Sequence, residues 1–267
     1  MKRYGRVLLV LLLALTLGGC ASRQSGSAAD SAMPQLVIGS DAYEPFFYLT
    51  VEDKPTGLDV ELAEEACRRM GYEPVFREIV WEQKDELLAN GEVDCLWGCF
   101  SMNGRESDYN WVGPYLYSRQ MVLVRADSDI YTLADLKDRR VAVQATGKAE
   151  AALLSRIDVR IPELMEVYSM STMSEVFACL RKGYVDAIAG HESALSVLAQ
   201  SAPDTYRMLN ESLSVSSLGV AFAKEDSSAV VEALRLTLED MRRDGTVDQL
   251  VAKYGLDTKN VYQEDTP

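Results

Sequence analysis

The feature of this chain that most constrains its fold is a short pattern that occurs twice. The pattern comprises a leucine, a glycine, a valine followed by an aspartate, and a second glycine, present as Leu88, Gly91, Val93, Asp94 and Gly98 and again as Leu180, Gly183, Val185, Asp186 and Gly190. Each copy predicts the end of a helix, a glycine in the left-handed conformation and a short buried strand. We expect these strands at residues 93–97 and 185–189. Two parts of the chain therefore share one local design.

Strand-like apolar runs alternate with helix-like amphipathic segments along the chain, which predicts an α/β fold with parallel sheets. Besides the two strands of the repeat, we expect strands at residues 36–39, 75–80, 121–124, 140–144, 164–168 and 218–223. Ligands of open α/β sheets bind beyond the carboxyl ends of the strands. The first candidates for a binding site are therefore the segments that follow the two copies, residues 98–105 and 190–192.

The N-terminus resembles a bacterial lipoprotein signal. Three basic residues precede an apolar run at 7–17, which ends in two glycines and Cys20; this run is shorter than the roughly 20 residues that span a membrane. The resemblance implies cleavage of residues 1–19 and acylation of Cys20, with palmitate as one expected acyl group. Residues 20–34 are predicted to form a flexible tether. We therefore expect a protein anchored by lipid on the extracytoplasmic face of the cell membrane; an ordinary secretory signal is the alternative.

The charge of the chain excludes two classes of partner. Its formal net charge is −14, and it becomes more negative when the basic signal is removed. An acidic protein is not expected to bind nucleic acid or an anionic lipid surface. The chain is also long enough, and apolar enough, for two compact lobes.

Four cysteines besides Cys20 leave three interpretations open. An oxidising compartment permits a disulfide from Cys67 to Cys95 or Cys99, although the connectivity cannot be deduced from the sequence. A zinc site would need a second pair of ligands, which the spacing from Cys95 to Cys99 does not supply, so we expect no metal. The third interpretation is that these thiols, with Cys179, are buried apolar groups.

An ordered set of motifs along nearly all of the predicted mature chain resembles the family-3 extracellular solute-binding proteins, the receptors of polar amino acid ABC importers. The set comprises Gly39, Tyr43, Pro45 and Phe46, Gly57 to Leu62, Trp81, the two copies of the repeat, Arg105, Gly113 to Tyr115, Val141 to Gln144, and Asp244 with Gly245. The resemblance implies a type II periplasmic-binding-protein-like fold, in which two α/β lobes joined by two crossover strands close on a ligand. It places the first lobe at residues 35–121 and 218–267, and the second at 122–217.

The same resemblance implies roles for individual residues. Arg105 matches the arginine that binds the ligand carboxylate, for which a planar guanidinium is suited. Tyr43 and Trp81 match pocket walls, with core packing as the alternative. The remaining matches are Gly98 at a strand end, Gln144, and the turn formed by Thr146, Gly147 and Lys148, where backbone amides at a helix N-terminus bind the same carboxylate.

Several positions depart from the family pattern. Phe100 and Met102 replace hydroxyl residues, which predicts a more apolar wall or a cation–π surface. His191, the only histidine, stands where the family has an acidic residue that pairs with the ligand ammonium. A neutral imidazole cannot neutralise an ammonium, so Glu192 is a candidate substitute. If His191 contacts the ligand with a near-normal pKa, affinity should vary between about pH 5.5 and 7.5.

Three functions follow as hypotheses. The first is a lipid-anchored, monomeric receptor that delivers an amino acid or related carboxylated solute to the permease of an ABC importer, without a cofactor or chemistry of its own. The second is an enzyme on the same scaffold, similar to cyclohexadienyl or prephenate dehydratases, with His191 or Glu192 as general acid beside Arg105. The third is a sensing module for a membrane partner. Motifs for metal hydrolysis or nucleotide binding are absent from the predicted mature chain, which favours the receptor.

Overall fold

The computed structural model describes residues 33–262. The predicted signal peptide, Cys20 and most of the predicted tether lie outside the described residues. The helices are α1 (Leu58–Met70), α2 (Lys84–Ala89), α3 (Lys148–Ser155), α4 (Met173–Arg181), α5 (Glu192–Ser201), α6 (Ala229–Arg243) and α7 (Thr246–Lys253), with 3₁₀ turns at Trp81–Gln83, Leu133–Leu136 and Thr258–Val261. Within residues 33–262, no helix is both long enough and apolar enough to span a membrane.

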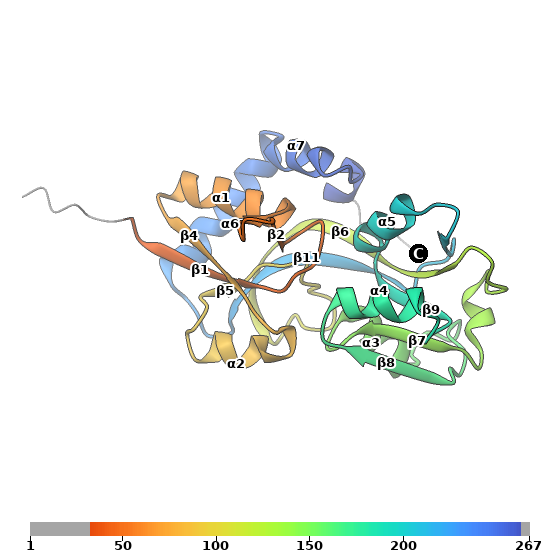
Figure 1. Cartoon of the computed structure of the whole chain (residues 1–267). Coiled ribbons are helices and arrows are strands. Elements are labelled where there is room, and N and C mark those ends of the chain that lie inside the picture. The colour runs from red at the N-terminus through yellow and green to blue at the C-terminus, as the bar shows by residue number, and fades with distance from the viewer. Residues whose placement is uncertain (1–32, 263–267) are drawn as a thin grey trace, which may run out of the picture. The chain divides into compact units, whose positions relative to one another are not determined.

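One extended sheet runs through this part of the chain, with the strand order β4-β1-β5-β11-β6-β9-β7-β8 and with β10 paired to β6 (Figure 1). The strands of this sheet are β1 (Gln35–Ser40), β4 (Glu73–Glu78), β5 (Cys95–Leu96), β6 (Tyr109–Arg125), β7 (Arg140–Gln144), β8 (Glu166–Met170), β9 (Ala187–His191), β10 (Tyr206–Met208) and β11 (Ser214–Ala223). A separate small ribbon is formed by β2 (Tyr48–Leu49) and β3 (Pro55–Thr56).

The prediction of purely parallel sheets is wrong at the centre of the sheet. Strands β4, β1 and β5 at one end are parallel, as are β9, β7 and β8 at the other. The long central strands β6 and β11 pair with each other in antiparallel orientation, and each also pairs antiparallel with its outer neighbour. The reason is geometric: β6 carries the chain from one end of the sheet to the other and β11 brings it back, so the two must run in opposite directions.

Helices cover the sheet by burying their apolar faces. At one end, α1 packs against α6 and α7 on one side of β1 and β4, and α2 lies on the other side (Figure 1). At the other end, α3 and α4 both pack against β7 and β9. The largest cluster of buried side chains includes Leu62, Phe222 and Leu238 and extends to Leu180 and Ile188. Helices therefore cover the sheet at each of its two ends. The parallel strands of both ends terminate near the middle of the sheet.

The repeated pattern has the same structure in both copies: a glycine ends the helix and an aspartate bonds to the neighbouring strand. Gly91 and Gly183 have φ values of 69° and 72°, in the left-handed region that favours glycine. Asp94 accepts a hydrogen bond at Oδ2 from the amide of Val37 at 2.7 Å, while its own amide donates to the Val37 carbonyl at 2.8 Å.

In the second copy, Asp186 makes the same pair of bonds with the amide and carbonyl of Arg140, at 2.8 and 2.9 Å. Each aspartate thus replaces a ladder position with a side-chain bond. Each strand therefore begins at the residue after its aspartate, at Cys95 and at Ala187. The sequence predicts that they begin at Val93 and Val185. The first strand is also shorter than predicted.

A buried carboxylate connects three elements near the first strand end. Asp59, in the first turn of α1, accepts hydrogen bonds from the amide of Cys99 at 2.7 Å and from the hydroxyl of Tyr115 at 2.9 Å. Asp59 is fully enclosed, and burial raises its pKa from 3.8 to about 7. The helix, the loop after β5 and the central strand β6 therefore share one acceptor.

Of the three interpretations of the cysteines, the structure matches the third. Cys67, Cys95, Cys99 and Cys179 are all free thiols, and the first three are buried. Within the described residues, no group of three or more His, Cys, Asp or Glu side chains is arranged to hold a metal ion.

Replacing Asp59 with alanine should destabilise the fold. The buried amide of Cys99 and hydroxyl of Tyr115 would lose their acceptor, at a cost of about 2–4 kcal/mol in the free energy of unfolding. Denaturant unfolding measures this change. Glu64→Ala, on the exposed face of the same helix, is the matched control and should change stability by less than about 0.5 kcal/mol. Equal stability of the two variants would contradict the role assigned to Asp59.

Candidate functional site

One pocket lies where strands from both ends of the sheet terminate. Nine of the residues selected from the sequence line it together: Tyr43, Trp81, Gly98, Phe100, Arg105, Gln144, Gly147, Lys148 and His191. The free volume at its centre is about 30 Å³, close to the volume that one water molecule occupies in the liquid. The structure therefore brings these nine residues together around a site that is closed and filled by their own side chains.

Arg105 reaches across this pocket. Its guanidinium donates to the carbonyl of Ser101 at 3.2 Å and to the carbonyl of Thr146 at 2.8 Å. The ring of Phe100 lies beneath it, with 5.3 Å between the guanidinium carbon and the ring centre. Burial lowers the pKa of Arg105, but arginine remains a cation in proteins. A buried cation that donates to neutral carbonyls is suited to accept a carboxylate instead.

Two lysines stand beside Arg105. Lys148, the first residue of α3, donates to the carbonyl of Asn103 at 3.0 Å. Lys84 donates to the hydroxyl of Thr146 at 3.2 Å and lies 5.4 Å from the ring centre of Trp81. These bonds join residues 84–105 to residues 146–148, two segments that come from opposite ends of the sheet.

Asp41 is a candidate ligand-binding residue that the sequence did not lead us to predict. It lines the same pocket, is 7% exposed and accepts a hydrogen bond from the side-chain amide of Gln144. Burial raises its pKa from 3.8 to about 6, with smaller contributions from Glu78 and Glu82. A signal for it was present: Asp41 follows the apolar run 36–39 after a single residue, Ser40, so the rule about strand ends applied to it as it did to the two repeats.

His191 is inside the pocket but is not a near-normal imidazole. It is 5% exposed; its ring Nε2 lies 2.9 Å from the side-chain amide nitrogen of Gln120, and its backbone amide donates to the hydroxyl of Tyr43 at 3.2 Å. Burial, assisted by the charge of Arg105, lowers its pKa to about 3. The premise of a near-normal imidazole, on which the expected pH dependence of affinity depended, is therefore wrong, because enclosure of His191 disfavours its charged form.

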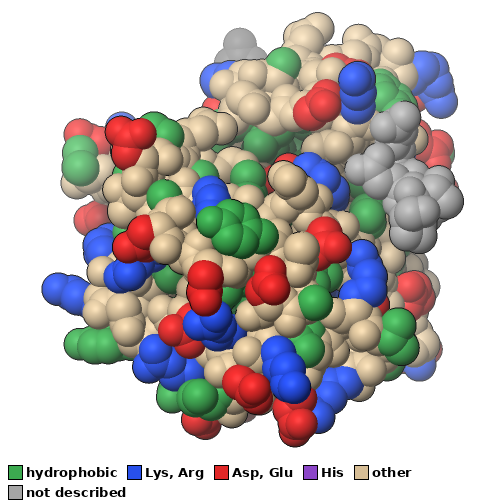
Figure 2. Space-filling model, turned by 90° about the vertical axis from the view of Figure 1, so that its right-hand side faces the viewer, with side chains coloured by type: hydrophobic (Ala, Val, Ile, Leu, Met, Phe, Trp, Pro, Cys, Tyr) green, Lys and Arg blue, Asp and Glu red, His purple; other side chains and the backbone are tan. Residues whose placement is uncertain are grey.

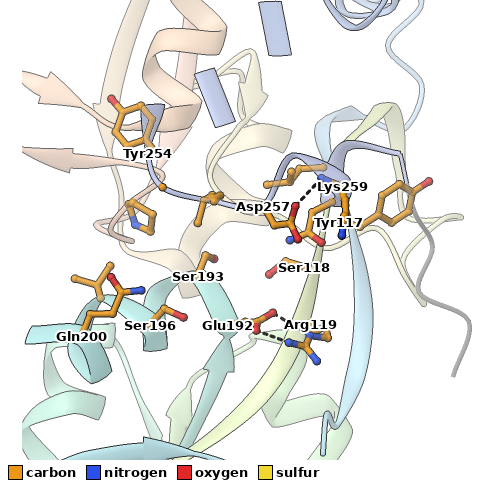
Figure 3. A pocket seen from close by; sticks show the side chains of 16 residues that line it. Tyr117, Ser118, Arg119, Glu192, Ser193, Ser196, Gln200, Tyr254, Asp257 and Lys259 are labelled. Carbon is orange, nitrogen blue, oxygen red and sulfur yellow. Dashed lines mark hydrogen bonds and ion pairs between the residues drawn. The ribbon is translucent and has the colours of Figure 1, made fainter. Parts of the chain in front are cut away.

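Glu192 does not line this pocket. It forms an ion pair with Arg119, at 2.9 and 2.5 Å, in a larger cavity of about 490 Å³ on the other side of β6 (Figure 3). Ser193, Ser196 and Gln200 of α5 line that cavity too. His191 is the last residue of β9 and has an extended backbone. Successive side chains of an extended segment point to opposite faces, which separates Glu192 from His191. Glu192 is therefore not placed to replace an acidic residue beside Arg105.

Phe100 and Trp81 belong both to the pocket wall and to the core. Their rings lie edge to face with centres 4.9 Å apart, and Phe100 also packs against Tyr109 and Trp111. Phe100 is 2% exposed. The cation over its face is the protein's own Arg105, so the predicted cation–π surface serves to hold Arg105 in position.

The turn before α3 uses two of its amides internally. The amide of Thr146 donates to the carboxylate of Glu150 at 2.7 Å, and the amide of Gly147 to the carbonyl of Gln144 at 3.2 Å. Thr146 has a φ of 56°, a strained conformation for a residue with a branched side chain. In this closed arrangement the turn contributes a carbonyl and a hydroxyl to Arg105 and Lys84, rather than free amides.

The surface differs from the pocket in its charge pattern. Acidic and basic side chains are interspersed over the face drawn in Figure 2, and hydrophobic side chains form separate small patches among them. On this face, charges of both signs are mixed and exposed to solvent, whereas the pocket brings Asp41, Arg105 and Lys148 into one small volume.

Removing the charge of Asp41 should reduce the pH dependence of stability. A carboxyl whose pKa rises from 3.8 to about 6 on folding holds its proton more tightly in the folded state. Its stabilising contribution is present below pH 3.8 and is lost as the pH rises through about 6, by about 3 kcal/mol. The decline in the free energy of unfolding between about pH 4 and 7 should be smaller in Asp41→Asn than in the wild type. Exposed Asp204→Asn should retain the wild-type profile, and parallel profiles for all three proteins would contradict the buried titration.

Comparison with known proteins adds three findings. A glutamate-binding protein, GluB, of Corynebacterium efficiens is 29% identical over 96% of this chain and 92% of its own length. The solved structure of Tv2483 bound to L-arginine has a TM-score of 0.77 and 28% identity, and covers 82% of this chain and 90% of its own. The ancestral amino acid-binding protein AncCDT-1, a precursor of cyclohexadienyl dehydratase, has a TM-score of 0.74 and 25% identity, and covers 82% and 95%.

The fold of this chain is thus that of type II periplasmic binding proteins, as the resemblance predicted. The family model of these proteins matches residues 36–257, which is nearly all of the described chain. The chain belongs to the bacterial extracellular solute-binding proteins, family 3.

Proposed function

We propose that this protein is the substrate-binding component of an ABC importer and that it binds an amino acid in the pocket around Arg105. The observation that carries the proposal is that Arg105 and Asp41, a permanent cation and an anion, line one buried pocket. The α-carboxylate and α-ammonium of an amino acid carry the complementary pair of charges. The relatives named above, which bind glutamate and arginine, support an amino acid as the ligand.

Each charged group in the pocket can exchange a neutral partner for a charged one. Arg105 donates to two main-chain carbonyls, and a ligand carboxylate would give stronger, charge-assisted bonds in the same positions. Asp41 accepts from a neutral amide of Gln144, and an ammonium would replace that partner and lower the pKa of Asp41. Asp41 would thereby take the role of the acidic residue that is missing at His191.

We propose that residues 35–121 with 218–267 and residues 122–217 form two lobes that open to admit the ligand. Strands β6 and β11 are the only candidates for crossovers within the described residues, since they connect the two ends of the sheet. The bonds from Arg105 and Lys84 to Thr146, and from Ser171 to Glu82 at 2.8 Å, bridge the proposed lobes. These bonds would break on opening and re-form around the ligand, which gives a permease a closed state to recognise.

Binding without chemistry is favoured over a dehydratase, although AncCDT-1 connects the fold to that activity. Of the two expected general acids, His191 has a pKa lowered to about 3 and would not carry a proton near neutral pH. Glu192 faces another cavity and is paired with Arg119. The pocket groups that remain are suited to hold charges on a ligand rather than to protonate a leaving group.

We also propose that the protein is lipid-anchored through Cys20, on the extracytoplasmic face of the membrane, and that it acts as a monomer. The support is the sequence of residues 1–20, in which a basic segment and a short apolar run lead to two glycines and a cysteine. An anchored receptor would remain close to its permease, which raises their effective concentration.

Arg105→Ala should weaken binding by about 2–5 kcal/mol, because the ligand carboxylate would be buried without its cation. Isothermal titration calorimetry with the amino acid that most raises the melting temperature of the wild type measures this change. Arg105→Lys should recover only part of the loss, since lysine lacks the planar fork. Arg125→Ala, an exposed arginine on β6, is the control, and an unchanged dissociation constant for Arg105→Ala would refute the role of Arg105.

Cys20→Ser should abolish acylation and release the protein from the membrane. The measurement is incorporation of labelled palmitate into the protein in a bacterial host, together with its partition between detergent and aqueous phases. Cys179→Ser removes a thiol from the folded part and should leave both results unchanged. Label that persists in Cys20→Ser, or that is absent from the wild type, would contradict the proposed anchor.

A further inference from the structure

More positively charged than negatively charged side chains line the pocket, and the hydrogen bonds of these cations go to neutral groups. Arg105 and Lys148 line it, and Lys84 stands directly behind two of its walls, Thr146 and Trp81. All hydrogen bonds given above for these cations end on neutral oxygens, the carbonyls of Ser101, Asn103 and Thr146 and the hydroxyl of Thr146. Within residues 33–262, neither Arg105 nor Lys148 has a carboxylate within the 4.0 Å of a salt bridge. Asp41 is the carboxylate that lines the pocket.

Arg105 is close enough to repel each of the two lysines. The charge of Arg105 lowers the pKa of Lys84 and that of Lys148, in each case after burial as the larger cause. The side chain of Lys84 is 5% exposed, and its nearest carboxylate, Asp85, is 3.7 Å away and 64% exposed. An exposed partner compensates a buried charge only weakly. The closed pocket therefore contains like charges whose repulsion an added anion would relieve.

Other carboxylates near the pocket are engaged elsewhere. Asp59 is turned into the core toward Cys99 and Tyr115, and Glu192 is paired with Arg119 in the cavity of Figure 3. Glu106 and Asp108 are exposed at the rim, where they affect Lys148 and Arg105 only through space. Asp85 and Glu82 also act on Lys84 through space, and Asp85 on Arg105, but neither carboxylate lines the pocket. Among the residues that line it, two cations, Arg105 and Lys148, stand with one anion, Asp41.

We propose that the ligand is an acidic amino acid whose side-chain carboxylate is bound by Lys148, with Lys84 adding to the local positive potential. This inference rests on the proposed function, in which Arg105 takes the α-carboxylate and Asp41 the α-ammonium. The ligand then brings two negative charges and one positive charge, which complements the charges in the pocket. A basic amino acid would add a further cation to the cluster and would be rejected.

This assignment goes beyond what the comparisons give, since relatives of similar identity bind glutamate and arginine, which have opposite side-chain charges. The discriminating position is Lys148, at the start of α3, because its chain reaches over the pocket to Asn103. The positive end of the α3 dipole lies at the same place and favours an anion there as well.

Titration calorimetry of the wild type with L-glutamate, L-aspartate, L-glutamine, L-asparagine and L-arginine tests the inference. One acidic amino acid should bind at least about ten-fold more tightly than its own amide, which corresponds to about 1.4 kcal/mol, and arginine should bind more weakly than either. Tighter binding of an amide or of arginine would overturn the inference and leave the proposed function in place. If none of these or the other amino acids binds, the proposed function fails as well.

Lys148→Met distinguishes binding of the ligand's side-chain carboxylate from binding of its α-carboxylate and α-ammonium. The variant should lose about ten-fold or more in affinity for the acidic ligand but less than about three-fold for the amide, and Lys148→Arg should retain the preference. Lys182→Met, an exposed lysine after α4, is the matched control. Equal losses for acid and amide would overturn the role of Lys148. Glutarate, which lacks an ammonium, should bind more weakly than L-glutamate in every variant; equal affinity would instead refute the role of Asp41.

If Lys148→Met does not fold, as judged by its melting temperature, the wild-type panel and Lys148→Arg still decide the question. The wild-type panel tests the charge of the ligand. Lys148→Arg tests whether a cation at this position is sufficient for the preference.

Discussion

The position of the binding pocket depends on the turn that follows β5, and that turn is fixed by two contacts. The buried carboxylate of Asp59 accepts a hydrogen bond from the amide of Cys99, and the residue Cys99 has a φ of 51°. One residue earlier, Gly98 lies so close to Ser40 that a Cβ would overlap its hydroxyl. The ends of β1 and β5 are therefore in close contact. Asp41 and the loop that leads to Arg105 follow these two strand ends and lie next to each other. The opposition of anion and cation, on which the proposed ligand depends, follows from this local packing.

Much of this arrangement could be predicted from the sequence because it depends on local signals. Gly91 and Gly183 mark helix ends, and the apolar runs before Gly98 and Gly190 end in the pocket, as expected. Asp41 was not predicted although the same rule applied to it, because the aromatic side chains that follow it are the stronger signal in this segment. Glu192 was misplaced because the next residue after an extended strand position points to the other face of the sheet, and the exact boundary between strand and helix is among the least predictable features of a sequence.

The features that could not be predicted are those that arise from tertiary structure. The pKa of His191 depends on its enclosure by Gln120, Ser101 and Tyr43, residues that are far apart in the sequence. The antiparallel centre of the sheet depends on the chain crossing twice between its ends. The excess of positive charge in the pocket depends on which neighbours are neutral, and Lys84 gave no sign in the sequence that it would be buried.

Arg105 and Lys148 donate to main-chain carbonyls of residues 101, 103 and 146, and the bonds to residues 103 and 146 cross the pocket. Every amino acid supplies a carbonyl at its position, so substitutions at these three sites leave the acceptors in place. The bonds to residues 103 and 146 therefore do not depend on the side chains at those positions, unlike the bonds from Lys84 to the Thr146 hydroxyl and from the Ser171 hydroxyl to Glu82. The proposed closure would therefore tolerate substitutions at these positions, which is compatible with the different ligands that its relatives bind.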